Sequence, residues 1–420
     1  MTNNKKSIFS IIGPGILVAA TGVGAGDMMT ASLGGSAIGV CILWAAVVGA
    51  LLKWYLNEGI ARWQMATGTT VLEGWAERLG AWIQWVFLFY LICWTFFTGG
   101  ALVSACGVAG TGLLPLSGDP VTSKIIWGIV HSLAGLLLVY FGGFRLFEKM
   151  MSICIGVMFL TVIVTAGLAK PDWSAVGYGL VVPRIPEAGS GWVLGILGGV
   201  GGTVTLLSYG YWIREKGRTG IEGMKTCRLD LAAGYVMIAF FGVAMVIIGS
   251  KVRIMGSGAN TAPILAEQLH HVMGPAGRWI FLIGFWGAVF SSLLGVWQSV
   301  PYIFTDFMTL RRGMSVEERQ SLDYTGTGTY RMFLFAITFV PLPLLLISVK
   351  KAQLIYAVLG SLFMPLLALT LLIMNNRRDW VGDDFRNGVT ANIVLAGTVA
   401  LFGYVGFIQA AEKMRMLLGL

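Results

Sequence analysis

The sequence predicts an all-α membrane protein with two inverted halves, in which the first and the sixth membrane spans are broken near their middle. Three observations predict this fold class. Hydrophobic residues make up 56% of the chain and charged residues only 12%, with a mean hydropathy of +0.78, values that soluble globular domains do not reach. Apolar stretches recur along the whole chain, and two glycine-dense stretches interrupt them at equivalent places.

Eleven spans are expected, because most of the apolar stretches reach the roughly 20 residues that a helix needs to cross a bilayer. Their approximate ranges are 11–36, 40–64, 82–108, 123–142, 149–168, 190–213, 229–249, 276–304, 331–349, 353–375 and 389–411. We assign the whole chain, 1–420, to one transmembrane transporter domain. Its first repeat covers about 11–170 and its second about 190–375, and the extra helix at about 389–411 follows them.

The two interruptions are Gly22 to Gly26 in the first span and Gly198 to Gly202 in the sixth. Glycine costs about 1 kcal/mol relative to alanine inside a helix. Unwound backbone persists in a membrane only where it lines a cavity or is buried in protein. Five spans make up the first half, so the halves face opposite ways across the membrane, as an inverted repeat requires. Paired breaks of this kind indicate the binding site of a secondary transporter.

The net charge of +9 reflects membrane topology rather than a nucleic-acid partner. With the N-terminus inside, we count 18 Lys and Arg residues on the inner side and 10 on the outer side, leaving out Lys53 within the second span. By the positive-inside rule, the N-terminus is expected in the cytoplasm and the C-terminus outside, in a plasma (inner) membrane. The five cysteines have no paired spacing, so no disulfide framework, zinc site or other cofactor is expected.

The first span, with Gly13-Pro14-Gly15 running to Ala20 and then Gly34-Gly35-Ser36-Ala37-Ile38-Gly39, resembles that of the Nramp family of divalent-metal transporters. Gly143-Phe144-Arg145 before the fifth span and Gly202-Thr203-Val204 at the sixth add to the likeness. The resemblance covers most of the chain in span order. It implies a LeuT-like fold, with a 5+5 inverted repeat and the substrate held between the unwound parts of spans one and six.

The departures from this family lie at the site itself. Where the family carries Asp-Pro-Gly-Asn, this chain has Gly24-Ala25-Gly26-Asp27, so the metal-binding aspartate is replaced by Gly24. Where the family has Met-Pro-His, the chain has Thr205-Leu206-Leu207, without a thioether. The acidic positions of the third span align with Trp94 and Phe97, and the glutamines of spans eight and ten with Phe290 and Phe363. A dehydrated transition ion needs more ligands than the one carboxylate and the few carbonyls that remain at the breaks. A hydrated magnesium ion, which keeps its water, does not.

Hydroxyl and aromatic side chains replace the lost ligands, which suits a small hydroxylated organic solute. The candidate substrate-binding residues are Gly24, Asp27, Thr205, Ser208, Tyr209, Trp94, Thr98, Ser292, Trp297 and Phe363. The hydroxyls near the breaks also have a simpler interpretation, since serine and threonine often satisfy freed backbone groups. The tryptophans likewise suit the interfacial belt or general packing.

Asp27 and His131 are the candidate coupling residues. Asp27 could bind substrate or a coupling ion, since buried membrane acids are functional by default, or it could cap the second half of the broken helix. His131 lies mid-span and could relay protons, or could be a packed neutral histidine. Proton coupling, sodium coupling and uncoupled transport all stay open. Glu58 with Lys53 and Arg62, and Asp230 with Arg228, are expected to form local ion pairs or gate contacts.

The leading interpretation is a secondary-active transporter for a small polar solute, with a hexose sugar as the best guess. The alternative is a divalent-cation carrier of altered selectivity, with Mg²⁺ before Mn²⁺. A second alternative is a membrane sensor that binds without transporting. Enzyme activity is not expected, because no nucleophile, base or metal cluster converges in the sequence.

Overall fold

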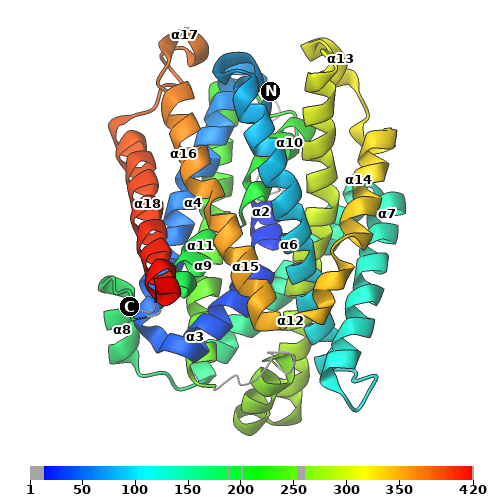
Figure 1. Cartoon of the computed structure of the whole chain (residues 1–420), viewed down its shortest axis with the longest axis vertical. Coiled ribbons are helices and arrows are strands. Elements are labelled where there is room, and N and C mark those ends of the chain that lie inside the picture. Colours follow the sequence, from blue (N-terminus) through cyan, green and yellow to red (C-terminus); the bar gives the residue numbers. More distant parts are fainter. Residues whose placement is uncertain (1–13, 188, 200–201, 253–260, 419–420) are drawn as a thin grey trace, which may run out of the picture.

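The structure is a computed structural model that describes residues 14–187, 189–199, 202–252 and 261–418. Within its helices, the side chains of a few further residues, among them 25–27, 143–145 and 409–418, lie outside the described part. Figure 1 shows a bundle of long helices that run roughly along one common direction. The described residues form helices and connecting segments without any strand, as the hydropathy pattern predicts.

Both predicted breaks are confirmed. The first span consists of α2 (Pro14–Gly22), the π-helix η1 (Ala25–Ala31), α3 (Ser32–Ile38) and the short 3-10 helix η2 (Gly39–Ile42). Gly24, between α2 and η1, has φ −154° and ψ −124°, far from helical values. The sixth span consists of α9 (Ser190–Gly199), the 3-10 helix η4 (Val204–Leu207) and α10 (Ser208–Glu215). Between α9 and η4, Gly202 has φ +88°, a conformation that glycine adopts at little cost.

The remaining nine spans are long enough to cross a membrane as continuous apolar stretches within the described residues. They lie in α4 (Leu43–Thr67), α6 (Ala81–Leu113), α7 (Pro120–Leu168), α11 (Gly220–Ser250), α12 (Thr261–Arg311), α14 (Gly328–Phe339), η6 (Leu342–Leu346), α15 (Val349–Ser361), α16 (Phe363–Met374) and α18 (Val389–Leu418). α7 carries both predicted spans four and five, as the apolar stretches Pro120–Gly142 and Leu146–Leu168. Each stretch has 23 residues, so each is long enough to cross the hydrocarbon layer on its own.

The tenth span contains an interruption that was not predicted from the sequence. α15 ends at Ser361 and α16 begins at Phe363. Pro365 accounts for it, because proline lacks the N–H that would bond to the carbonyl of Ser361, and its ring crowds that carbonyl.

Short helices mark the two ends of the bundle. α13 (Val316–Ser321) and α17 (Arg378–Val381) lie at one end, and α3 and α8 (Trp173–Val181) at the other (Figure 1). The first end, called the α13 end below, also holds α5 (Val71–Gly74), the π-helix η3 (Trp75–Leu79) and the 3-10 helix η5 (Tyr324–Gly326), which contact α13 or the end of α12. The last helix, α18, runs from near α17 toward the opposite end (Figure 1).

Candidate functional site

The first break is packed directly against α12. A side-chain carbon added to Gly24 would lie 2.0 Å from Cβ and 2.3 Å from Oγ of Ser292. Both residues are buried. The hydroxymethyl group of Ser292 therefore fills the space that any larger side chain at position 24 would need, and a carboxylate has no room there.

Serine hydroxyls from α12 also bind the backbone carbonyls at the carboxyl end of α2. Ser292 Oγ donates to the carbonyl of Thr21 at 2.8 Å, and Ser291 Oγ lies 3.1 Å from the carbonyl of Ala20. A helix that stops inside a membrane leaves such carbonyls without intrahelical partners. At this break the carbonyl of Thr21 thus already accepts a hydrogen bond, and the Ser291 hydroxyl, which also lies 2.9 Å from the carbonyl of Ala288, is within reach of that of Ala20.

The second break is closed by contacts of a similar kind. Lys53 on α4 donates from Nζ to the carbonyl of Gly198, one residue before the end of α9, at 2.7 Å. A side-chain carbon added to Gly202 would lie 2.7 Å from Thr205 Oγ1 and 3.7 Å from the Cα of Gly22, which places the two breaks next to each other. Thr205 therefore lies at the junction of the two broken spans, and its contact with substrate stays a prediction.

Several buried polar groups on the elements around this junction have no hydrogen-bond partner within the described part of the chain. They are Thr21 Oγ1, Thr30 Oγ1, Trp94 Nε1, Thr95 Oγ1, Thr98 Oγ1, Thr203 Oγ1, Ser208 Oγ and Trp297 Nε1. Leaving a buried donor or acceptor unsatisfied costs about 1–3 kcal/mol. These groups are consistent with a region that takes up water or a polar solute.

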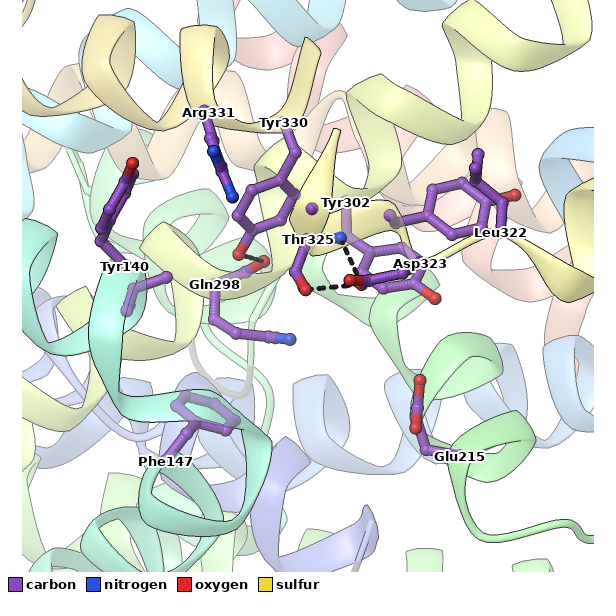
Figure 2. Close-up of a pocket in the computed structure, with 13 residues that line it drawn as sticks. Tyr140, Phe147, Glu215, Gln298, Tyr302, Leu322, Asp323, Thr325, Tyr330 and Arg331 are labelled. Carbon is purple, nitrogen blue, oxygen red and sulfur yellow. Dashed lines mark hydrogen bonds between the residues drawn. The ribbon is translucent and has the colours of Figure 1, made fainter. Parts of the chain in front are cut away.

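A vestibule of about 360 Å³ lies at the α13 end, between α7, α12, η5 and α14 (Figure 2). Its wall combines aromatic rings with charged groups: Val139, Tyr140, Phe147, Glu215, Gln298, Tyr302, Leu322, Asp323, Tyr324, Thr325, Gly326, Tyr330 and Arg331. A hydrogen bond from the Thr325 hydroxyl holds the pKa of Asp323 below its usual value, so this carboxylate stays charged at neutral pH. The vestibule can therefore admit a hydrated or polar solute.

A narrow neck leads from the vestibule toward the second break. It shares Glu215, Gln298 and Tyr302 with the vestibule, and its free volume is only about 10 Å³. Its other lining residues are Ser208, Tyr211, Trp212 and Ser299. A space of this size holds about one water molecule. Ser208 lines it, and the predicted contact of Ser208 with substrate stays a prediction.

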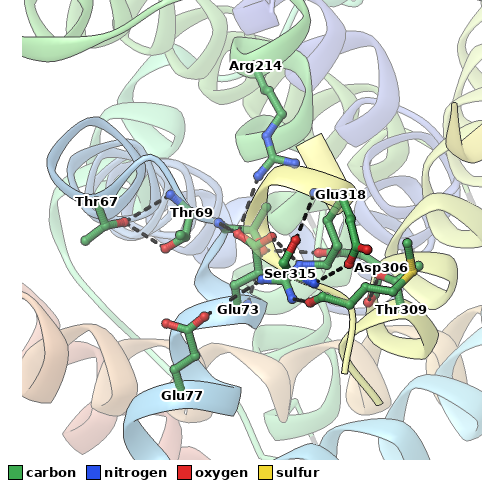
Figure 3. Close-up of polar contacts among 12 residues, drawn as sticks. Thr67, Thr69, Glu73, Glu77, Arg214, Asp306, Thr309, Ser315 and Glu318 are labelled. Carbon is green, nitrogen blue, oxygen red and sulfur yellow. Dashed lines mark hydrogen bonds and ion pairs between the residues drawn. The ribbon is translucent and has the colours of Figure 1, made fainter. Parts of the chain in front are cut away.

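A buried polar cluster ties α10 to its neighbours beside the neck (Figure 3). Glu73, on α5, forms ion pairs with Arg319 of α13 at 3.2 Å and with Arg214 of α10 at 3.4 Å. Asp306, on α12, accepts hydrogen bonds from the hydroxyls of Tyr211 at 2.7 Å and of Tyr324 at 3.0 Å. We call these residues the Glu73–Asp306 cluster, which links the second half of the broken sixth span to elements beyond it.

Tyr209 and Phe363 are buried and have contacts with other parts of the protein, and their proposed contact with substrate stays a prediction. The Tyr209 hydroxyl contacts Asp230 Oδ2 at 3.2 Å, on α11. Phe363 stacks on Tyr90 with ring centroids 5.9 Å apart, and further aromatic rings surround it. Trp94, Thr98 and Trp297 are buried and have the unpartnered polar atoms named above. Their contact with substrate stays a prediction.

Both ring nitrogens of His131 are engaged. Nε2 accepts a hydrogen bond from Trp286 Nε1 at 2.7 Å, so Nδ1 carries the proton, which it donates to the carbonyl of Trp127 at 2.7 Å. These bonds describe a neutral histidine packed between α7 and α12, and its role in coupling stays a prediction.

We therefore expect His131→Gln, which retains hydrogen-bonding ability, to leave the pH dependence of transport unchanged. The measurement is the initial transport rate between pH 5 and pH 8 in proteoliposomes, beside the wild type. A profile that loses one titration step in the variant would restore His131 as a coupling residue.

The predicted ion pair of Glu58 with Arg62 is present, whereas Lys53 and Asp230 have partners other than the predicted ones. Glu58 pairs with Arg62 and with Arg228, the latter at 2.9 Å, rather than with Lys53, which reaches Gly198 instead. Asp230 pairs with Arg218 at 2.8 Å rather than with Arg228. Its Oδ1 also accepts the N–H of Gly15 at 2.9 Å, which binds α11 to the start of α2.

The side chain of Asp27 lies outside the described residues, so its role stays a prediction. Its backbone belongs to η1, immediately after the first break. Within the described part, no three His, Cys, Asp or Glu side chains gather closely enough to hold a metal ion. The described groups thus do not form an inner ligand set for a bare transition metal.

Comparisons with known proteins agree with this architecture. Residues 15–409 match the model of a protein family described as Nramp, natural resistance-associated macrophage protein-like. The chain is 23% identical over 391 residues to the divalent metal cation transporter MntH of Burkholderia ambifaria, covering 90% of this chain and 83% of that protein. It is 22% identical over 408 residues to MntH of Acidiphilium cryptum, covering 93% and 88%.

Solved structures show the same fold. A crystal structure of the Eremococcus coleocola manganese transporter matches with a TM-score of 0.74 at 17% identity, covering 100% of this chain and 90% of that one. The structure of MhsT in complex with L-phenylalanine matches with a TM-score of 0.58 at 16% identity, covering 96% and 97%. The predicted all-α fold with two broken spans is therefore confirmed, whereas the boundaries of its repeats stay a prediction.

Proposed function

Since this chain belongs to the Nramp family of multi-pass membrane transporters, and is thus a transporter rather than an enzyme, we propose that it carries a divalent metal cation that keeps most of its water. The relatives named above support the metal, because their names describe divalent metal cation transporters. The comparisons lend no support to a sugar as the first choice.

One observation carries the proposal of a hydrated ion. Ser292 fills the space beside Gly24 and donates a hydrogen bond to the carbonyl of Thr21, so a carboxylate has no room at position 24 and one lone pair of this carbonyl is already engaged. Magnesium gives up its water reluctantly and is commonly bound through it. A thioether, which helps to select manganese, is absent from position 205, where this chain has threonine. We therefore place Mg²⁺ before Mn²⁺.

Transport is proposed to proceed by alternating access around the two breaks. The N-terminus is proposed to lie in the cytoplasm of a cell whose plasma membrane holds the protein, so that the α13 end, with its vestibule, faces inward. A proton, a sodium ion or no coupling ion at all would be compatible with the fold. Asp27 is proposed to contact either the hydrated cation or a coupling ion.

Ion uptake into proteoliposomes tests the proposed cargo. We expect saturable Mg²⁺ uptake, slower Mn²⁺ uptake, and competition by cobalt(III) hexaammine, which has a size close to that of hydrated Mg²⁺, carries a higher positive charge and cannot exchange its ligands. Protein-free liposomes are the control. Saturable Mn²⁺ uptake without Mg²⁺ uptake would contradict the proposal.

A second candidate is a small polar organic solute, a hexose first. The unpartnered groups around the junction, such as the hydroxyls of Thr203 and Ser208 and the indole N–H of Trp94, favour it because they could bind the hydroxyls of such a ligand. The same liposomes distinguish the candidates. Saturable uptake of a labelled hexose or polyol, with no metal flux, would replace the divalent cation by this second candidate.

A further inference from the structure

A lysine ammonium lies inside the membrane-spanning part of the protein, next to the second break. Lys53 is on α4, within a helix long and apolar enough to span the membrane, and its side chain is fully buried. Its Nζ donates a hydrogen bond to the carbonyl of Gly198 at 2.7 Å. A charged group at this depth is costly, and such groups are rarely kept without a functional reason.

The position of Lys53 at a helix end explains how its charge is stabilised. α9 ends at Gly199, so the carbonyls of its last turn lack intrahelical partners. The carboxyl end of a helix carries a partial negative charge, which favours a cation. Gly49 lies one turn before Lys53, and a side-chain carbon added to it would lie 3.0 Å from the carbonyl of Leu197, so α4 and the end of α9 are in close contact.

Two acidic groups on α4 and on the neighbouring α11, both with described side chains, are engaged by other residues. Glu58, farther along α4, is held by Arg62 and Arg228. Asp230, on the neighbouring α11, is held by Arg218 and by Tyr209. α9 itself contains no charged residue. The Lys53 ammonium is therefore directed at the end of a broken helix rather than included in either of these ion pairs.

Transporters with broken helices bind their coupling cations at the carboxyl ends of the half-helices and at unwound carbonyls. In this chain an ammonium already lies at that place. We propose that Lys53 is a resident cation that occupies the position of a monovalent coupling ion at the second break, so that the transport cycle requires no sodium. The proposal rests on the chain being a transporter and does not depend on which cargo it carries.

The first test uses the unmodified protein. Cargo uptake and apparent melting temperature are measured with Na⁺ and with N-methyl-D-glucamine as the main cation, at constant ionic strength. We expect no difference in either quantity. A fall in transport of about tenfold or more without sodium would overturn the proposal.

The second test removes the ammonium. Lys53→Ala deletes three methylene groups and the ammonium, a volume that propylammonium can refill. We expect Lys53→Ala to lower the apparent melting temperature, and propylammonium or Na⁺ to raise it again in this variant but not in the wild type, while 1-propanol has no such effect. Lys53→Met, which keeps most of the volume without the charge, should lower transport about tenfold, and Lys53→Arg should retain more.

Lys124 provides a matched control. It is also buried in the spanning region, and its Nζ donates to a backbone carbonyl, that of Leu345, at 2.7 Å, but it lies away from both breaks. Lys124→Ala should lose stability without acquiring a response to Na⁺. If Lys53→Met transports at the wild-type rate, or if Lys53→Ala and Lys124→Ala respond to cations alike, the proposal is wrong. The melting measurements need no cargo, so this outcome is separate from failure of the proposed Mg²⁺ transport.

Discussion

Gly24→Ala is expected to abolish most transport, because the added methyl group would lie 2.0 Å from Cβ of Ser292. Atoms cannot approach this closely, so the first break and α12 must separate. Overpacking of this kind costs about 1–3 kcal/mol, and the displacement falls at the junction of the two broken spans. The measurements are the transport rate in proteoliposomes and the apparent melting temperature in detergent.

A second substitution makes this prediction specific. Ser292→Gly removes the opposing side chain, so the double variant should recover part of the activity that Gly24→Ala alone loses. Recovery should be incomplete, because the hydroxyl that binds the carbonyl of Thr21 is also gone. Gly156→Ala, where a side chain would meet no atom within 4 Å, is the control and should behave as wild type. Equal effects of Gly24→Ala and Gly156→Ala would contradict the packing described here.

Glu73→Ala is expected to have the largest effect on stability. The substitution removes the ion-pair partner of the buried guanidinium of Arg319 and of the half-buried guanidinium of Arg214. It also removes the carboxylate that accepts a hydrogen bond from the N–H of Thr70. Breaking a buried ion pair by removal of one member costs about 3–5 kcal/mol. Because Arg214 lies in the last turn of α10, the second half of the broken sixth span, transport should also fall.

Glu222→Ala is the matched control for this prediction. Its ion pair with Lys225 is exposed to solvent on both sides, and such pairs contribute little to stability. Apparent melting temperatures of the two variants are compared under the same conditions. If Glu73→Ala melts at the same temperature as Glu222→Ala, the Glu73–Asp306 cluster does not hold α10 in place.

The breaks were predictable from the sequence because glycine is unfavourable inside a helix, so two dense groups of it within apolar spans indicate interrupted helices. The spans were predictable for a similar reason, since a run of about 20 apolar residues is typical of a membrane-crossing helix. The break in the tenth span was not predicted, although Pro365 provides a signal for it. A proline within an apolar stretch interrupts the helix near the residues that precede it.

The contacts that close the site were not predictable. Ser292 and Thr21 are 271 positions apart, and no spacing rule gives the register of two helices that are so distant in sequence. The target of Lys53 was missed for the same reason, since Glu58 on its own helix was the nearer candidate. A lysine within an apolar span nevertheless indicates a buried polar contact, because a charge inside the membrane requires a partner. The capping box of Thr70 and Glu73 likewise indicates the start of a helix in the sequence. The ion pair that joins Glu73 to Arg214 of α10 could not be predicted in this way.

The junction of the two broken spans is not expected to take up a bare transition ion, because Ser292 and Lys53 already donate hydrogen bonds to two of its carbonyls and no carboxylate fits at position 24. An anomalous-scattering crystal structure of the protein soaked in Mn²⁺ tests this directly. We expect no manganese peak within about 2.5 Å of the carbonyls of Ala20, Thr21 or Gly198, a distance that covers direct coordination by oxygen. A manganese ion bound directly to any of these three oxygens would contradict it.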